Sequence, residues 1–274
     1  MAQAVSLEAF GLSKEFGYMQ HSDPVASLSA ANKAWDEMAR NLPKYLMGSD
    51  FRVRVKSLPP FKMDALANEG EVRRAMLALS YIGMAYQWSE NDAAHVIPSV
   101  LAEPWYELGV KVGRPPILSY VSYSIDNWYR LDPKKEIECG NIALLQCFLG
   151  GQDEEWFILI HIDIEKKAGI ALHAIVLAQR AVVANDSDAL DIALTQLRDG
   201  IKSMYEVLAR MPEKCDPYVY FHRVRPYIFG WRNNPALPNG VVYEGVEALG
   251  GKGMTYRGET GAQSAIVPAL DAVL

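Results

Sequence analysis

The sequence predicts an almost entirely α-helical protein, and three observations favour this class. Apolar residues recur with the helical period along most of the 274 residues. Alternating strand and helix patterns, which a parallel sheet requires, are absent. Half of the residues are hydrophobic, enough for a substantial core. We expect a small N-terminal helical domain over residues 1–113 and a larger helical domain over residues 114–274, divided at a Gly-Arg-Pro-Pro break.

Break signals separate the elements of the N-terminal half. An amphipathic helix is expected over residues 25–46, where Met-Gly-Ser-Asp ends it. Residues 51–60 alternate in polarity and end in two prolines, which predicts an edge strand at best. A strong helix is expected over residues 69–88, because it begins with acidic residues and carries an apolar stripe.

The C-terminal half is also dominated by helical patterns. They are expected over residues 117–129, 156–184, 186–209 and 217–229. Pro226 should kink the last of these helices. Irregular chain follows to about residue 263, and the final residues have the pattern of a new helix.

Composition argues against several partners and compartments. The formal net charge is −6 and no long basic run occurs, which disfavours nucleic acid and anionic membranes. We find no apolar stretch of about 18 residues that would span a membrane. The N-terminus lacks a secretory signal pattern, and the three cysteines form no CxxC pair. We expect a cytoplasmic protein whose oligomeric state the sequence leaves open.

Common catalytic and metal-binding motifs are absent from the sequence. It contains no HExxH motif, P-loop, GxGxxG motif or GxSxG elbow. The five histidines are scattered rather than clustered with cysteines, so no zinc site is expected. Any chemistry must come from less conventional arrangements.

One such arrangement surrounds His161. This histidine lies in an apolar helical run, with Phe157 one turn before it and Glu165 one turn after it. It can be a core histidine bonded to a carbonyl or to Glu165. It can instead be a lone polar group above an apolar pocket, where it orients a ligand or takes a proton.

A second arrangement contains Tyr220, Phe221 and Arg225 within one to two helical turns. An arginine beside aromatic rings can bind a carboxylate through two parallel hydrogen bonds while the rings hold an apolar body. A surface arginine that stacks on its neighbours is the alternative.

Two further segments complete the candidates. The Gly-Glu-Thr-Gly loop at residues 258–261 has two glycines and the hydroxyl of Thr260, which together can hold a charged group, or the loop can simply be flexible. Tyr120 and Tyr123 are spaced to share a helical face, as in a core stripe. Taken together with Arg225, these residues predict a pocket for an aromatic amino acid.

Longer motifs then point to a known family. Residues 115–128 read PPILSYVSYSIDNW, residues 220–246 read YFHRVRPYIFGWRNNPALPNGVVYEGV, and residues 256–264 read YRGETGAQS. These motifs, with residues 42–59 and 79–98, resemble the indoleamine 2,3-dioxygenase family of haem enzymes. The resemblance runs from about Asp23 to the end of the chain. It implies a small helical domain, a larger helical domain that holds haem b, and insertion of O2 into the C2–C3 bond of the tryptophan indole to give N-formylkynurenine.

The resemblance implies roles for residues on the distal side of the haem. Phe157 matches the aromatic residue that contacts the indole, and Tyr120 and Tyr123 match residues that line the distal pocket. His161 stands where the mammalian enzymes have serine. The related tryptophan 2,3-dioxygenases have a histidine in the distal pocket that hydrogen-bonds the indole N–H, so we expect His161 to be catalytic.

The resemblance also implies how the amino-acid part of the substrate is held. Tyr220 and Phe221 match the aromatic pair beside the substrate, the first being phenylalanine in the mammalian enzymes. Arg225 matches the arginine that binds the carboxylate. Thr260 and Gly261 match the loop that closes over substrate and haem.

The family's proximal haem ligand has no match in this sequence. That histidine follows the GETGAQS loop in the family, so we expect it beyond Leu274, in a longer protein of which this chain is a fragment or a shortened version. The chain alone should then bind haem poorly and be inactive. None of the five histidines aligns with the ligand; they are His21, His95, His161, His173 and His222.

Three functions remain open from the sequence. The expected one is a haem-dependent tryptophan or indoleamine dioxygenase. One alternative is a relative that binds tryptophan but modifies the indole differently in secondary metabolism, for which Tyr220 and His161 leave room. The other is a haem protein on this fold without enzymatic activity.

Overall fold

The computed structural model describes residues 6–273, and helices dominate these residues, as the sequence predicts. The helices are α1 (Lys33–Arg40), α2 (Leu42–Tyr45), α3 (Phe51–Lys56), α4 (Glu69–Trp88), α5 (Ser99–Val112), α6 (Gln152–Ala184), α7 (Ser187–Leu208), α8 (Pro217–Val219), α9 (Arg225–Ile228) and α10 (Ile266–Asp271). Two π-helical turns lie at Val121–Ile125 and Tyr220–Val224. Leu274 lies outside the described residues.

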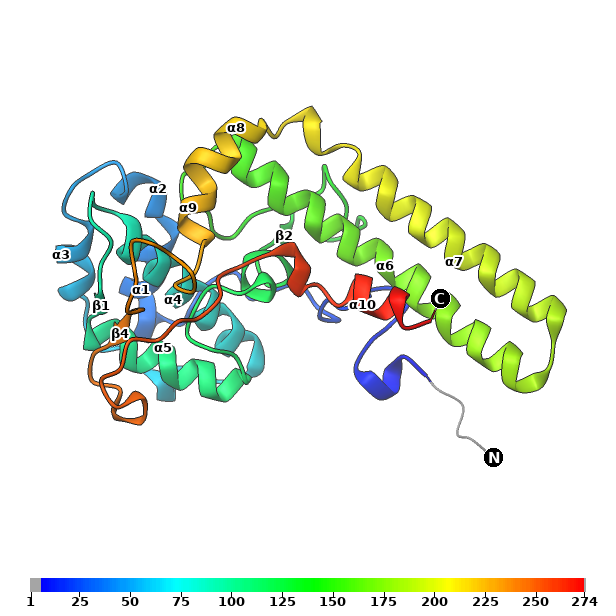
Figure 1. Ribbon diagram of the computed structural model, residues 1–274, viewed down its shortest axis with the longest axis horizontal. Coiled ribbons are helices and arrows are strands. Elements are labelled where there is room, and N and C mark those ends of the chain that lie inside the picture. Colours follow the sequence, from blue (N-terminus) through cyan, green and yellow to red (C-terminus); the bar gives the residue numbers. More distant parts are fainter. Residues whose placement is uncertain (1–5, 274) are drawn as a thin grey trace.

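Two small sheets tie distant segments together. β1 (Val96–Ile97) pairs in parallel with β4 (Val242–Tyr243), and β2 (Tyr129–Arg130) pairs antiparallel with β3 (Ile142–Ala143). Each strand contributes two residues. The pairings therefore only join neighbouring segments, and the helices form most of the structure. The β1–β4 pairing holds the irregular C-terminal chain against the N-terminal half (Figure 1).

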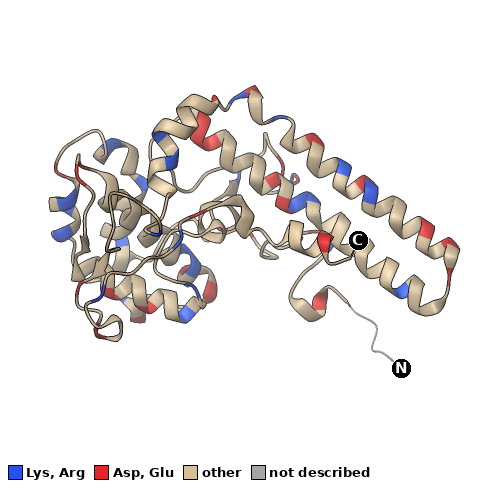
Figure 2. Cartoon of the chain, viewed as in Figure 1, with Lys and Arg blue, Asp and Glu red and all other residues tan. Residues whose placement is uncertain are grey.

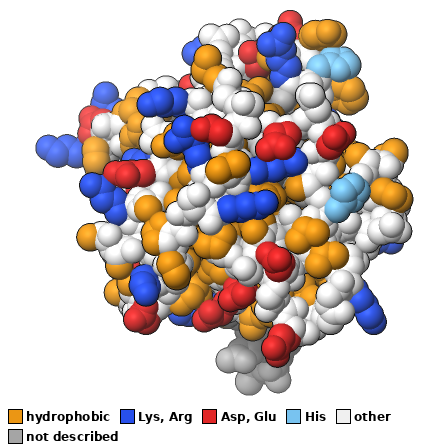
Figure 3. Space-filling model, turned by 90° about the vertical axis from the view of Figure 1, so that its left-hand side faces the viewer, with side chains coloured by type: hydrophobic (Ala, Val, Ile, Leu, Met, Phe, Trp, Pro, Cys, Tyr) orange, Lys and Arg blue, Asp and Glu red, His pale blue; other side chains and the backbone are white. Residues whose placement is uncertain are grey.

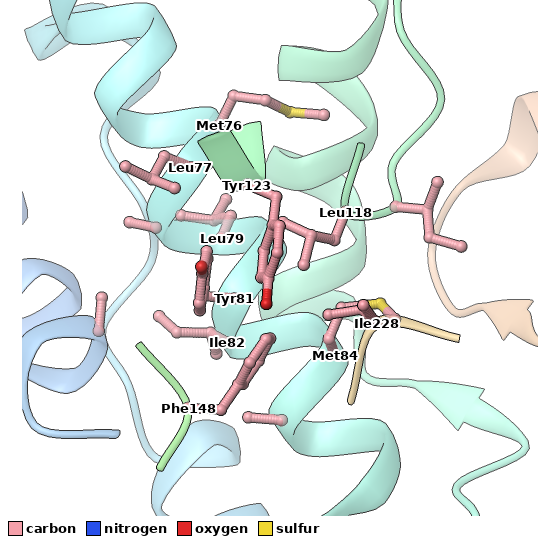
Figure 4. Close-up of a cluster of buried hydrophobic side chains, with 14 of the residues drawn as sticks. Met76, Leu77, Leu79, Tyr81, Ile82, Met84, Leu118, Tyr123, Phe148 and Ile228 are labelled. Atoms are coloured by element: carbon pink, nitrogen blue, oxygen red, sulfur yellow. The ribbon is translucent and has the colours of Figure 1, made fainter. Parts of the chain in front are cut away.

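Helix α4 forms the centre of the body, and its bounds match the prediction from sequence. The Asn68 side chain caps it by accepting a hydrogen bond from the Glu71 amide at 3.0 Å. Helix α4 is buried over most of its surface, as expected for a helix that other elements surround. Figure 4 shows Tyr81 of α4 beside Phe148 and Tyr123 in this core, with the Tyr81 and Phe148 ring centroids 4.4 Å apart.

Helices α6 and α7 form a long antiparallel pair that extends away from the body (Figure 1). Asn185 ends α6 in the left-handed conformation, and the Asp186 side chain caps α7. Gly200 of α7 lies against the Ala171 backbone, where an added β-carbon would stand 2.9 Å from the Ala171 nitrogen. Both helices confirm the prediction, although α6 begins four residues earlier than expected.

Three segments differ from the predicted secondary structure. Phe51–Lys56 forms helix α3 and not an edge strand, because Phe51 and Val55 are one turn apart and both are buried. Residues 25–29 are not helical, since the Asp36 carboxylate accepts a hydrogen bond from the Leu28 amide and holds this segment extended. Helix α5 was not expected from the sequence, which has Pro104 inside it.

The segment predicted as a helix over residues 117–129 contains little more than one π-helical turn. The side chain of Asn127 explains why the helix stops there. Its amide nitrogen donates to the Gln146 carbonyl at 3.0 Å, and its oxygen accepts from the Gln146 amide at 2.8 Å. These bonds fasten the chain after Ile125 to the loop that precedes α6.

One helix among the described residues, α6, is long and apolar enough to cross a membrane by length and composition alone. The expectation that no such segment exists is therefore wrong. Half of its most apolar window is buried within the protein, and a core helix meets the same criterion. Asp163 and Glu165 of this helix are both buried, which fits packing in a protein core.

Charged side chains are spread over the molecule. Figure 2 shows acidic and basic residues following one another along α7, and Figure 3 shows both signs interspersed at the opposite end. Gly113 ends α5 in the left-handed conformation, at the position of the predicted break. The division into domains over residues 1–113 and 114–274 stays a prediction.

Candidate functional site

Five ring side chains meet where α6 passes the two π-helical turns. Phe157 stacks on Tyr220 with ring centroids 3.9 Å apart, and the His161 ring lies 4.4 Å from Phe157. The Tyr123 and Tyr220 hydroxyls are 3.2 Å apart. Tyr120 meets the His161 ring edge-on at 6.1 Å. We call these five residues the aromatic cluster; all five are candidates that the sequence had indicated.

The π-helical turns determine where the tyrosines of the aromatic cluster lie. A π turn places one extra residue in a helical turn and so changes the direction of the side chains that follow. Asp216 caps α8 just before the second turn, by accepting hydrogen bonds from the amides of Tyr218 and Val219. Pro226 lacks an amide hydrogen, and the geometry changes from π to α at Arg225, next to the predicted kink.

The hydrogen bonds of His161 define the state of its ring. Its Nδ1 lies 2.7 Å from the carbonyl oxygen of Phe157. Because a carbonyl can only accept, Nδ1 carries the hydrogen, and this assignment leaves Nε2 with a free lone pair when the ring is neutral. Burial lowers the pKa of His161, which favours the neutral ring. His161 therefore presents a hydrogen-bond acceptor.

The acceptor of His161 faces the loop at residues 258–261. A β-carbon added at Gly261 would stand 3.6 Å from the His161 Nε2 atom, so the loop backbone passes close to the ring. Of the two partners expected from sequence, a carbonyl is the one that His161 uses. Glu165 bonds elsewhere.

Sequence reasoning missed the role of Glu165 in joining the site together. Its Oε1 accepts hydrogen bonds from the Tyr120 hydroxyl at 2.8 Å and from the Ser264 hydroxyl at 2.6 Å. The Gln263 side chain accepts from the Tyr120 amide at 2.8 Å and donates to the Gly258 carbonyl at 3.0 Å. The only signal for Glu165 in the sequence was its place one turn after His161.

A cavity of about 250 Å³ lies between α9 and the 258–261 loop, and Arg225, Glu259 and Thr260 are among its lining residues. The Glu259 amide donates to the Ile228 carbonyl at 3.1 Å and so fastens the loop to α9. Thr260 caps the turn that follows by accepting from the Ala262 amide. The loop thus connects two neighbouring regions, the aromatic cluster and the cavity beside Arg225.

Phe221 is not brought into the aromatic cluster. Its side chain is 60% exposed and lies edge-on to the His222 ring. Thr260 and Gly261 are also exposed, as is the Arg225 side chain at the mouth of the cavity. The loop therefore approaches the His161 ring at Gly261 and lines the cavity beside Arg225 at Glu259 and Thr260.

The described residues suit the substrate side of a haem better than its proximal side. Three neighbours from different elements, Tyr120, Phe157 and His161, offer the apolar and polar groups of a distal pocket. Among residues 6–273, no group of three or more histidine, cysteine or acidic side chains could hold a metal ion by itself. The proximal ligand expected beyond Leu274 stays a prediction.

Comparisons with known proteins identify the family. The sequence model of the family described as "Indoleamine 2,3-dioxygenase" matches residues 6–274. The chain is 35% identical to rat indoleamine 2,3-dioxygenase 1, over 98% of the chain and 65% of the relative. It is 33% identical to human indoleamine 2,3-dioxygenase 2, over 100% of the chain and 67% of the relative.

A third relative carries a different name. The chain is 28% identical to the myoglobin of Haliotis madaka, over 98% of the chain and 69% of that protein. The chain spans about two thirds of the length of these relatives. Since the family model covers nearly all of the sequence and identity extends along the whole chain, this protein belongs to the indoleamine 2,3-dioxygenase family.

Proposed function

We propose that this chain provides the substrate side of a haem-dependent dioxygenase that acts on the indole ring of L-tryptophan or a related indoleamine. The product would be N-formylkynurenine. The observation that carries the proposal is the aromatic cluster with the free acceptor of His161, one loop away from Arg225. The family and the motifs of the sequence support the same reaction.

The aromatic cluster suits an indole ring. Phe157 and Tyr220 stack on each other, and a flat apolar group could join this stack. An indole N–H is a donor only, and the His161 Nε2 atom is an acceptor only. One hydrogen bond would fix which edge of the indole meets the histidine, and so which carbon atoms face the oxidant.

Arg225 suits the substrate carboxylate. Its guanidinium can form two parallel charge-assisted hydrogen bonds with a carboxylate. It lines the cavity beside the 258–261 loop, and among the described residues it forms no ion pair within 4 Å. A group that is not already paired can bind a substrate anion without first losing a protein partner.

Haem b, when bound, would supply the iron that activates O2. The chain's own residues would hold the substrate and exclude water. Tyr120, Phe157 and His161 would face the haem on the substrate side and exclude water, while the loop with Thr260 and Gly261 would close over the amino-acid end. Exclusion of water strengthens the hydrogen bonds that hold the substrate.

Methylation of the indole nitrogen tests this proposal. We expect hemin-supplemented protein to bind L-tryptophan at least ten-fold more tightly than 1-methyl-L-tryptophan, because the methyl group removes the only donor for His161. Product analysis with L-tryptophan should show N-formylkynurenine in a protein that also carries the proximal haem ligand, and no product with residues 1–274 alone. Equal affinity for the two ligands would contradict the role of His161, and a different indole product would favour altered chemistry.

Reversible O2 binding is the second candidate function. The similarity to a protein named myoglobin favours it, since that relative matches 98% of this chain. In this case His161 would hold a ligand rather than orient an indole. Reversible oxygenation of the ferrous protein without consumption of L-tryptophan would identify this function.

A further inference from the structure

Glu259 is a buried acid whose carboxyl group has no protein partner among the described residues. Its side chain is only 8% exposed and forms no hydrogen bond or ion pair within the described part of the chain. A largely buried carboxylate without a protein partner is costly, because it keeps only part of its contact with water. Such a group in a cavity wall points to a ligand that can donate hydrogen bonds to it.

The surroundings of Glu259 are those of a binding site and not of a structural ion pair. Glu259 lines the same cavity as Arg225, whose positive charge acts on it, but no ion pair within 4 Å joins the two. Burial raises the pKa of the Glu259 carboxyl to about 7, and Arg225 offsets this effect only in part. A ligand cation beside the carboxyl group would favour its ionised form.

The loop does not need this carboxylate to keep its shape. The Glu259 backbone amide, not its side chain, bonds the Ile228 carbonyl. The Gln263 side chain closes the loop onto Gly258 at 3.0 Å, and Gly258 packs directly against Gly230. Since the backbone and Gln263 hold the loop, the acidic side chain is available for a ligand.

We propose that the Glu259 carboxylate binds the α-ammonium group of the substrate while Arg225 binds its α-carboxylate. An α-amino acid carries one positive and one negative group on the same carbon. Glu259 is the acid that lines this cavity, beside the arginines Arg225, Arg232 and Arg257. The pair would select zwitterionic amino acids over indole acids that lack the amine. This inference rests on the function proposed above.

Binding of three ligands to the full chain tests the inference. Isothermal titration calorimetry would compare L-tryptophan, indole-3-propionate without the amine, and tryptamine without the carboxylate. We expect Glu259→Gln to weaken L-tryptophan and tryptamine at least ten-fold and to leave indole-3-propionate within two-fold. Glu247→Gln is the matched control, because Glu247 is exposed in the same irregular region.

The outcomes separate this inference from the proposed function. If Glu259→Gln binds L-tryptophan as tightly as the native chain while Arg225→Ala does not, Glu259 has no role in ammonium binding and the proposed function stands. An equal loss for all three ligands would show that Glu259 maintains the loop, which overturns the inference. If the native chain binds none of the ligands, both proposals are overturned.

Discussion

Single hydrogen bonds decide which polar atoms of the candidate site are free to bind a substrate. The Phe157 carbonyl occupies Nδ1 of His161 and leaves Nε2 free, whereas Tyr120 and Ser264 both occupy one oxygen of Glu165. From the sequence, His161 could have bonded either a carbonyl or Glu165. His161 keeps its acceptor beside the 258–261 loop, while the other oxygen of Glu165 is buried without a hydrogen-bond partner.

Replacement of Arg225 tests the proposed carboxylate site. We expect Arg225→Ala to lower affinity for L-tryptophan by about 2–3 kcal/mol, at least roughly 30-fold, because two charge-assisted hydrogen bonds are lost. The side chain is exposed, so the fold should be kept. Calorimetry would measure the affinity, and far-UV circular dichroism would measure whether the fold is kept. Arg223→Ala, an exposed neighbour outside the cavity, is the control, and near-native affinity in Arg225→Ala would contradict the assignment.

Replacement of His161 tests its role toward the indole. We expect His161→Ala to lose the discrimination between L-tryptophan and 1-methyl-L-tryptophan, because the acceptor for the indole N–H is gone. Thermal stability should fall only modestly, since one bond to the Phe157 carbonyl is removed. A ratio of affinities unchanged from the native chain would show that His161 is a structural residue.

At the scale of the elements, local sequence signals explain which predictions succeeded. Helices α4 and α7 have a capping side chain and a clear apolar period, and the sequence placed both within a residue or two. Helix α3 is too short to show a period, and alternation in six residues fits either a strand or a helix. The two π-helical turns depend on contacts between distant segments, which periodicity cannot reveal.

The turn before α6 should make stability depend on pH. Glu154 is 1% exposed and accepts hydrogen bonds from the amides of Phe148, Leu149 and Gly150. Burial raises the pKa of Glu154 to about 7 despite these bonds. The folded state then keeps a proton that the unfolded state releases above about pH 4.3. The stabilisation is present below this pH and is lost as the pH rises through 7.

We therefore expect the free energy of unfolding to fall by about 1–3 kcal/mol between pH 5 and pH 8. Glu154→Gln should flatten this slope, because an amide does not titrate in this range. Glu259 has a similarly raised pKa, so some slope should persist until Glu259→Gln is added. Urea unfolding at several pH values measures the effect, and an unchanged slope in the double variant would refute it.

At the scale of the whole molecule, the site is built from segments far apart in the sequence. The hydroxyls of Tyr123 and Tyr220 meet across 97 positions, and the Ser264 hydroxyl donates to the Glu165 carboxylate across 99. Residue types and spacing predicted the candidates on each segment and a shared pocket, and the family resemblance gave each candidate a place in it. Neither predicted Glu259, because an isolated acid in a glycine loop has the pattern of a solvated turn.

The positions of the histidines bear on how this chain would take up haem. His161 and His173 both lie on α6, twelve residues apart, which corresponds to about 18 Å along the helix and about 120° around it. They cannot coordinate one iron from opposite faces. The other three are exposed and lie on other segments: His21, His95 and His222.

We accordingly expect residues 1–274 to bind hemin weakly and without a stable five-coordinate ferrous state, because haem iron requires an axial ligand from the protein. Spectra of the reduced protein, with and without CO, during a hemin titration would measure this. The five single His→Ala variants are the controls, and each should give the same weak binding. Stoichiometric uptake that one of these variants abolishes would identify that histidine as the ligand. If that residue were His161, its free Nε2 atom would face the iron and could not accept the indole N–H.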